Sequence, residues 1–100
     1  MPDYAFSLAA LARYEKLEAD PRLWSVIDRL DDVIERLAAA PGAAEFRRHR
    51  WQNPPAFAVA ISAGGSDWMV LWEQIGEDAE YENLRTGDVH VLYVGPWPGG

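Results

Sequence analysis

The residues best equipped for chemistry lie together in the middle of the sequence. Arg47, Arg48 and Arg50 surround His49. Guanidinium groups match the oxygen atoms of a phosphate, and histidine titrates nearest to neutral pH, so this group has the composition to bind a phosphate and move a proton. In an extended segment, alternation would place Arg48 and Arg50 on one face and Arg47 with His49 on the other. One short cluster also fits a solvated connecting strand or a docking site for an acidic partner segment, and we favour these simpler interpretations.

A second histidine, His90, lies in the last apolar segment of the chain and is a further candidate for proton transfer. Tyr93 follows three residues later, and in a regular strand the two side chains point to opposite faces. They could not then act together as an acid–base pair. A strand histidine that is hydrogen-bonded or faces solvent is the simpler interpretation. A catalytic site, if the chain has one, would therefore draw on Arg48, His49, Arg50 and His90.

The tryptophans are candidates for binding either nucleobases or a protein. Trp68 and Trp72 share one face of a predicted strand, and two aromatic residues opposite a helical layer are more simply core residues than a platform for stacked bases. Trp51 and Trp97 flank proline-containing turns outside the predicted strands. Partly exposed aromatic residues often anchor protein partners. We therefore expect Trp51 and Trp97, together with Arg47, to contact a protein partner.

The acidic residues that precede the last strand suggest a metal site that their spacing does not support. They lack the alternating ligands and the obligatory glycine of an EF-hand loop. The chain has no cysteine for zinc, disulfides or thiol catalysis, and Gly64-Gly65 joins two predicted strands instead of opening a phosphate-binding helix. We therefore predict neither a metal site nor a cofactor site. The acidic residues in question are Glu77, Asp78, Glu80 and Glu82.

Length and charge restrict the classes of function. The 100 residues suffice for one domain, which we place at residues 1–95, followed by a short proline- and glycine-rich tail at 96–100. The net charge of −7, with Lys16 as the only lysine, argues against a protein that gains most of its affinity by neutralising phosphates. The sequence has no signal-peptide pattern and no apolar run long enough for a membrane span, so we expect a cytoplasmic protein without a membrane partner.

The first half of the chain predicts a short strand and two helices. Residues 4–8 alternate large and small side chains, as a short strand does. A first helix is expected from about Ser7, and its buried face would carry Leu8, Leu11, Ala12 and Leu17. Asp20-Pro21 supplies a capping side chain and a proline suited to a first helical turn, and Pro41-Gly42 ends the second helix. Between them, apolar residues recur at helical spacing at Leu23, Val26, Ile27, Leu30, Val33, Ile34 and Leu37.

The second half predicts three antiparallel strands that cover the helices. Residues 56–61 and 68–73 alternate apolar side chains on either side of a glycine-rich turn. A last strand follows an irregular acidic segment. Its two faces would be formed by Val89, Val91 and Tyr93 on one side and by Leu92 and Val94 on the other. The predicted fold class is therefore α+β, with an N-terminal short strand and a two-helix hairpin packed on a mostly antiparallel sheet of about four strands.

Six segments follow one another in a defined order: Tyr4-Ala5-Phe6-Ser7, Ala40-Pro41-Gly42, Phe46-Arg47-Arg48-His49-Arg50, Phe57-Ala58-Val59, Trp68-Met69-Val70-Leu71-Trp72 and Val91-Leu92-Tyr93-Val94-Gly95. Their order and spacing resemble the RelE/ParE toxin superfamily over nearly the whole chain. The resemblance implies a toxin of a type II toxin–antitoxin pair, inhibited by a small antitoxin protein. It also implies one of two targets, which are ribosome-bound mRNA for the RelE-like nucleases and DNA gyrase for the ParE branch.

The chain departs from this family where RelE-like nucleases carry basic residues on the sheet. Those residues stabilise the phosphate during attack by the 2′-hydroxyl group, because developing negative charge needs preorganised cations. Ala58, Ala60, Met69 and Pro96-Trp97 stand there in this sequence. We therefore favour a toxin-family protein that acts through protein partners. Two alternatives stay open: a ribosome-dependent mRNA endonuclease that uses the 47–50 cluster, and a non-toxic protein-binding domain of the same fold.

Overall fold

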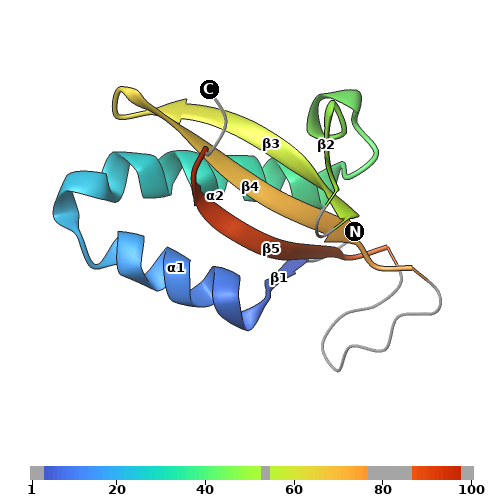
Figure 1. Cartoon of the computed structure of the whole chain (residues 1–100), viewed down its shortest axis with the longest axis horizontal. Helices are drawn as coiled ribbons and strands as arrows, with labels where there is room; N and C mark the ends of the chain where they lie inside the picture. The colour runs from blue at the N-terminus through green and yellow to red at the C-terminus, as the bar shows by residue number, and fades with distance from the viewer. Residues whose placement is uncertain (1–3, 53–54, 77–86, 98–100) are drawn as a thin grey trace.

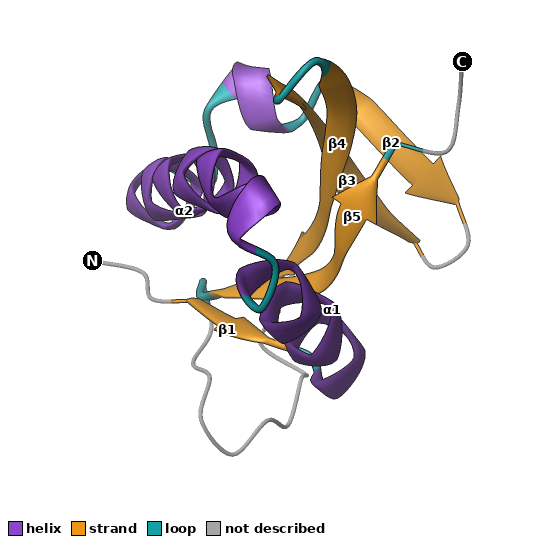
Figure 2. Cartoon of the chain, turned by 90° about the vertical axis from the view of Figure 1, so that its left-hand side faces the viewer, coloured by secondary structure: helices purple, strands orange, loops and turns teal. Residues whose placement is uncertain are grey.

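Two α-helices lie against one face of a twisted sheet in the computed structural model (Figure 1 and Figure 2). The structure describes residues 4–52, 55–76 and 87–97. This arrangement confirms the predicted α+β fold class. Along the described chain the elements are β1 (Tyr4–Phe6), α1 (Leu8–Glu18), the 3₁₀ helix η1 (Pro21–Leu23), α2 (Trp24–Ala39), the 3₁₀ helix η2 (Ala44–Phe46), β2 (His49–Gln52), β3 (Pro55–Ala63), β4 (Ser66–Gln74) and β5 (Val89–Pro96).

Within the described residues the sheet has five strands in the order β1-β5-β4-β3-β2. β1 runs parallel to β5, and all other neighbours are antiparallel. β2 is not among the four strands of the predicted sheet; part of the arginine-rich segment, for which a solvated connecting strand is one of the favoured interpretations, forms it. A two-residue turn joins β3 to β4, and there Gly64 and Gly65 have φ of +59° and +79°. Glycine adopts both values without strain, which is the requirement of a type I′ hairpin turn.

The apolar stripe of α2 supplies the helical side of the core, as predicted. Leu30, Ile34 and Leu37 are at most 1% exposed. They belong to the same buried cluster as Val70 and Trp72 of β4, the strand at the centre of the sheet. The predicted assignment of the strand tryptophans to the core is therefore correct. None of the described helices is long and apolar enough to cross a membrane.

Side-chain caps fix where the helical segments begin. The Ser7 hydroxyl oxygen accepts a hydrogen bond from the Ala10 N–H at 3.1 Å, and the Asp20 carboxylate accepts one from the Arg22 N–H at 3.0 Å. Each bond satisfies a backbone N–H that a first helical turn leaves without an intrahelical partner. The second helical segment therefore begins where predicted, first as η1 and from Trp24 as α2.

The buried face of α1 differs from the prediction. Leu8 is 88% exposed and Leu11 39% exposed, and Ala12 also faces solvent. The helix instead turns Ala10, Tyr14 and Leu17 inward, a stripe with the same helical spacing. Ala10 is fully buried, and its small side chain lets α1 pack closely against the neighbouring β5. Periodicity alone could not separate these two stripes, because both recur every three or four residues.

Tyr14 ties the two helices together. Its hydroxyl group donates a hydrogen bond of 2.5 Å to the Asp31 carboxylate on α2. Burial, together with this hydrogen bond and the negative charge of Asp31, raises the pKa of the Tyr14 phenol well above its ordinary value. The neutral phenol is favoured because ionisation would place a second negative charge beside the carboxylate. The bond therefore requires that the Tyr14 phenol keep its proton.

A β-bulge reverses the faces of the last strand. Leu71 pairs with Tyr93 whereas Trp72 pairs with Val91, so Leu92 is an extra residue in β5. Val94 consequently joins the helix-side core, and Tyr93 points to the opposite face. The predicted faces, with Tyr93 beside Val91 and Val94 opposite, are therefore wrong. Strict alternation fails wherever one residue is inserted into a strand.

We expect Leu30→Ala to lower the free energy of unfolding by about 2–5 kcal/mol, because it removes a fully buried side chain and leaves a cavity in its place. Leu8→Ala is the matched control, because the same atoms are removed from a helical leucine that is 88% exposed. Its effect should stay within about 0.5 kcal/mol. Urea unfolding followed by tryptophan fluorescence measures both values. Equal effects would mean that the two helices are packed differently from this structure.

The Tyr14–Asp31 hydrogen bond should make stability depend on alkaline pH. Below about pH 10 the phenol is neutral in the folded and the unfolded chain. At higher pH the unfolded chain loses the phenolic proton first, because the folded pKa is raised, so the free energy of unfolding falls as pH rises. Tyr14→Phe should be less stable than the parent by about 1 kcal/mol at pH 7. That difference should shrink between pH 9 and pH 11; a constant difference in urea unfolding would contradict this account.

Candidate functional site

The face of the sheet that points away from α1 and α2 carries its own apolar cluster, which we call the outer cluster. Its members alternate along β3 and β4 with the residues that face the helices. The fully or nearly buried members are Ala56, Ala58, Met69 and Leu71, and the partly buried members are Trp51, Leu92, Tyr93 and Trp97. Ala58 and Met69 are only 1% and 3% exposed, so this face has a small hydrophobic core of its own.

Two tryptophans from distant parts of the chain meet over this cluster. Trp51 lies on the edge strand β2, and Trp97 follows β5, yet their ring centroids are 6.5 Å apart. The backbone N–H of Trp97 donates a hydrogen bond of 3.0 Å to the backbone oxygen of Asp67. His49 lies edge-on to Trp97, with 5.7 Å between the ring centroids. The two predicted partner contacts therefore form one partly exposed aromatic surface, and the sequence did not predict that they would be neighbours.

Arg47, the third predicted partner contact, is held by interactions within the chain. Its Nε donates a hydrogen bond of 2.8 Å to the Pro41 carbonyl oxygen, and its terminal amino group donates one of 2.8 Å to the Gln74 side chain. The guanidinium group also lies 5.1 Å from the centre of the Phe57 ring and 5.7 Å from the Trp72 ring. These contacts fix the segment that enters β2 against the sheet.

The arginine-rich segment does not alternate as predicted, because the strand begins only at His49. Arg50 lies over the same Phe57 ring as Arg47, at 5.2 Å from its centre. His49 points to the outer cluster, where it contacts Trp97. The predicted pairing of Arg47 with His49 on one face is therefore wrong, since Arg47 is the C-cap residue after the 3₁₀ helix η2 and precedes the regular strand.

Arg48 faces a third environment, a pocket of about 380 Å³ between α2, η2 and β3. We call it the arginine pocket, because Arg29 and Arg36 of α2 line it together with Arg48. Phe46, Val59 and Ile61 contribute apolar side chains to its wall, and Glu45 contributes a carboxylate. Sequence reasoning placed Arg48 among the catalytic candidates but missed its two partners. Their spacing of seven residues along one helix face was the signal that would have identified them.

His90 lies on the outer face of β5, far from the arginine-rich segment. Its side chain is 12% exposed, and its Nδ1 atom lies 3.8 Å from the Glu73 carboxylate. β3 and β4 separate His90 from His49, so the two histidines are three strand spacings apart, roughly 14 Å along the sheet. The bulge brings Tyr93 to the same face as His90, against the expectation for a regular strand. The four catalytic candidates thus lie in separate environments and not around one point.

Among residues 4–52, 55–76 and 87–97, no three side chains with metal-ligating groups come together. The acidic residues Glu77, Asp78, Glu80 and Glu82 lie outside the described residues.

The predicted tail begins at residue 96, and the structure shows that Pro96 still pairs with Trp68 as the last residue of β5.

No protein-family model, curated protein or solved structure matches this chain. The resemblance to the RelE/ParE toxins therefore stays a prediction from the sequence segments given above. What the site can do has to follow from its side chains, which offer an apolar aromatic surface on one face and three guanidinium groups on the other side of β3.

Arg47→Ala should lower the free energy of unfolding by about 1–3 kcal/mol, because it leaves the buried Pro41 carbonyl oxygen without its donor and removes the contacts of the guanidinium group with the Phe57 and Trp72 rings. Arg48→Ala is the control in the adjacent residue, which is exposed. It should change stability by no more than about 0.5 kcal/mol. Urea unfolding of both variants tests the distinction. A larger loss for Arg48→Ala would show that the pocket arginine, and not Arg47, holds this segment in place.

Proposed function

We propose that this chain is the toxin of a type II toxin–antitoxin pair, of the RelE/ParE kind, and that it acts by binding proteins. A small antitoxin protein would neutralise it. The observation that supports the protein-binding mechanism is the outer cluster, an apolar surface that includes Ala58 and Met69, where the resemblance would place the cations of RelE-like nucleases. The order of elements, with a short strand, two helices and antiparallel strands, supports the family assignment.

The separation of the basic residues disfavours the nuclease alternative. Cleavage of RNA by its own 2′-hydroxyl group needs cations directed at one phosphate. Here Arg47 and Arg50 contact the Phe57 ring, Arg48 faces the arginine pocket, and His90 lies three strands from His49. The net charge of −7 would also repel a polyanion over most of the surface.

The aromatic surface has the character of a protein-binding site. Trp51 and Trp97 are partly exposed and rest on a floor of buried side chains that includes Met69. Tryptophan at the centre of an apolar patch is a frequent anchor of protein interfaces, because it buries a large area with little loss of conformational freedom. A protein target such as DNA gyrase fits this surface better than ribosome-bound mRNA. A non-toxic protein-binding domain would use the same surface without arresting growth.

Growth of a bacterial host after induction of the chain tests the proposal. We expect arrest by the parent chain, no relief by Arg48→Ala with Arg50→Ala, and relief by Trp51→Ala or Trp97→Ala, because these remove the aromatic anchors. Arg47 is kept unchanged, since its contacts belong to the fold. Far-UV circular dichroism of each purified variant serves as the folding control.

The other outcomes select between the alternatives. Arrest that the double arginine change relieves, in a folded variant, would support the endonuclease. Normal growth in the presence of a folded parent chain would leave the non-toxic binding domain as the better account and rule out an active toxin under these conditions.

A further inference from the structure

Half of strand β3 has an open edge. β2 pairs with β3 only from Pro55 to Ala58, and β4 covers the opposite edge as far as Ala63. Within the described chain, no strand pairs with Val59–Ala63 on the side away from β4. Figure 1 shows β2 lying beside one end of β3 only. An open edge of this kind presents a row of backbone donors and acceptors to another chain.

The geometry of the hairpin identifies which peptide groups are presented. Ala63 and Ser66 flank the two-residue turn, so they form the hydrogen-bonded pair that closes it. Hydrogen-bonding direction alternates along an antiparallel strand. The peptide groups of Ala60 and Ser62 therefore point away from β4 and toward the open edge. Both residues also line the arginine pocket, which places the pocket directly beside this edge.

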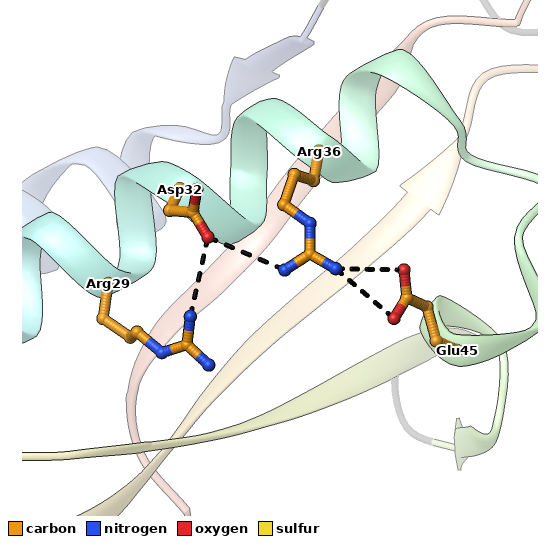
Figure 3. Close-up of polar contacts among 4 residues, drawn as sticks. All are labelled: Arg29, Asp32, Arg36 and Glu45. Carbon is orange, nitrogen blue, oxygen red and sulfur yellow. Dashed lines mark hydrogen bonds and ion pairs between the residues drawn. The ribbon is translucent and has the colours of Figure 1, made fainter.

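Three guanidinium groups surround the open edge in a chain that is otherwise acidic. Arg29 and Arg36 reach from α2, and Arg48 reaches from the segment before β2. Figure 3 shows Asp32 between the two helical arginines and Glu45 beside Arg36. The three cations and the two carboxylates leave a local excess of one positive charge, in contrast to the net charge of −7 of the whole chain.

The ion pairs around the pocket leave the arginines available to another carboxylate. The distances from Asp32 to Arg29 and Arg36 are 3.5 and 3.6 Å, and Glu45 lies 3.2 Å from Arg36. All four side chains are about half exposed. Exposed pairs of this kind contribute little to stability and exchange readily with other anions. Arg48 has no carboxylate partner among the ion pairs of the described residues.

We infer that the open edge of β3 binds an extended acidic segment of a protein partner, which adds to the sheet as a further strand in line with β2. The inference rests on the proposed function, in which a protein partner neutralises the chain, and it names the chemistry of the bound segment. The backbone of the segment pairs with Ala60 and Ser62. Its carboxylates meet Arg29, Arg36 and Arg48.

The same geometry defines the sequence pattern of the segment. Side chains of a strand alternate between the two faces of a sheet, so only every second residue faces α2 and the arginines. The segment has about five residues, the length of the open edge, with acidic residues at alternate positions. The residues between them point to the outer face, beside Ala60 and Ser62, which alternate along β3 with the helix-facing Val59 and Ile61, so small apolar residues fit there. Nucleic acid would satisfy the arginines but not the peptide groups of the edge.

A peptide titration followed by NMR tests this site. The probe is a capped six-residue peptide of alternating valine and glutamate, added at low salt to the ¹⁵N-labelled full chain. We expect chemical-shift changes along Val59–Ala63 and at least fivefold slower amide hydrogen exchange at Ala60 and Ser62. Arg29→Gln with Arg48→Gln should raise the dissociation constant at least tenfold. Arg22→Gln is the matched control, because Arg22 is an exposed arginine of η1 paired with Asp20.

Several results would overturn the inference. These are equal binding of a peptide of alternating valine and lysine, unchanged exchange at Ala60 and Ser62, or tighter binding of a single-stranded oligonucleotide to the same residues. The spectra of the variants report directly whether they are folded. Slower exchange at Ala60 and Ser62 in a chain that does not arrest growth would contradict the toxin proposal and support this binding site. Growth arrest without slower exchange would support the toxin proposal and contradict this binding site.

Discussion

The burial of Trp72 determines how the two halves of the chain fit together. Its side chain is fully buried on β4, the central strand of the sheet, and its indole N–H donates a hydrogen bond of 3.1 Å to the Phe46 carbonyl oxygen. A buried N–H needs an acceptor, because an unsatisfied polar group in the core is costly. This bond fixes η2 against the sheet, and Arg47 then packs over the same ring. The course of the arginine-rich segment thus follows from satisfying one indole group.

Residue patterns predicted those elements for which one arrangement buries clearly more apolar surface than any other. α2 has a single apolar stripe at helical spacing, and its Leu30 and Ile34 are buried as expected. α1 carries two stripes of equal spacing, and contact with β5 selects the one through Ala10. The bulge at Leu92 leaves no mark in the local sequence, because only the pairing partner shows that β5 has one residue more than β4 requires.

The candidate site was predictable by residue type but not by arrangement. Trp51 and Trp97 stand out in the sequence as tryptophans near prolines, yet nothing in the sequence shows that their ring centroids lie 6.5 Å apart, with the Trp97 backbone bonded to Asp67 of β4. The arginines stand out as a cluster, yet they separate because η2 ends within it and β2 begins at His49. Residues that are neighbours in sequence need not face the same site when the backbone changes conformation between them.

An open strand edge is also the place at which identical molecules can join into dimers or fibres. The half of β3 that β2 leaves uncovered is short and bordered by Arg29 and Arg48, and a second copy would bring the same cations to the same place. Repulsion between these like charges, added to that between two acidic chains, opposes self-association in dilute salt. Added salt screens this repulsion. Higher ionic strength should therefore favour edge-to-edge pairing of two copies through β3, and low ionic strength should keep the copies apart.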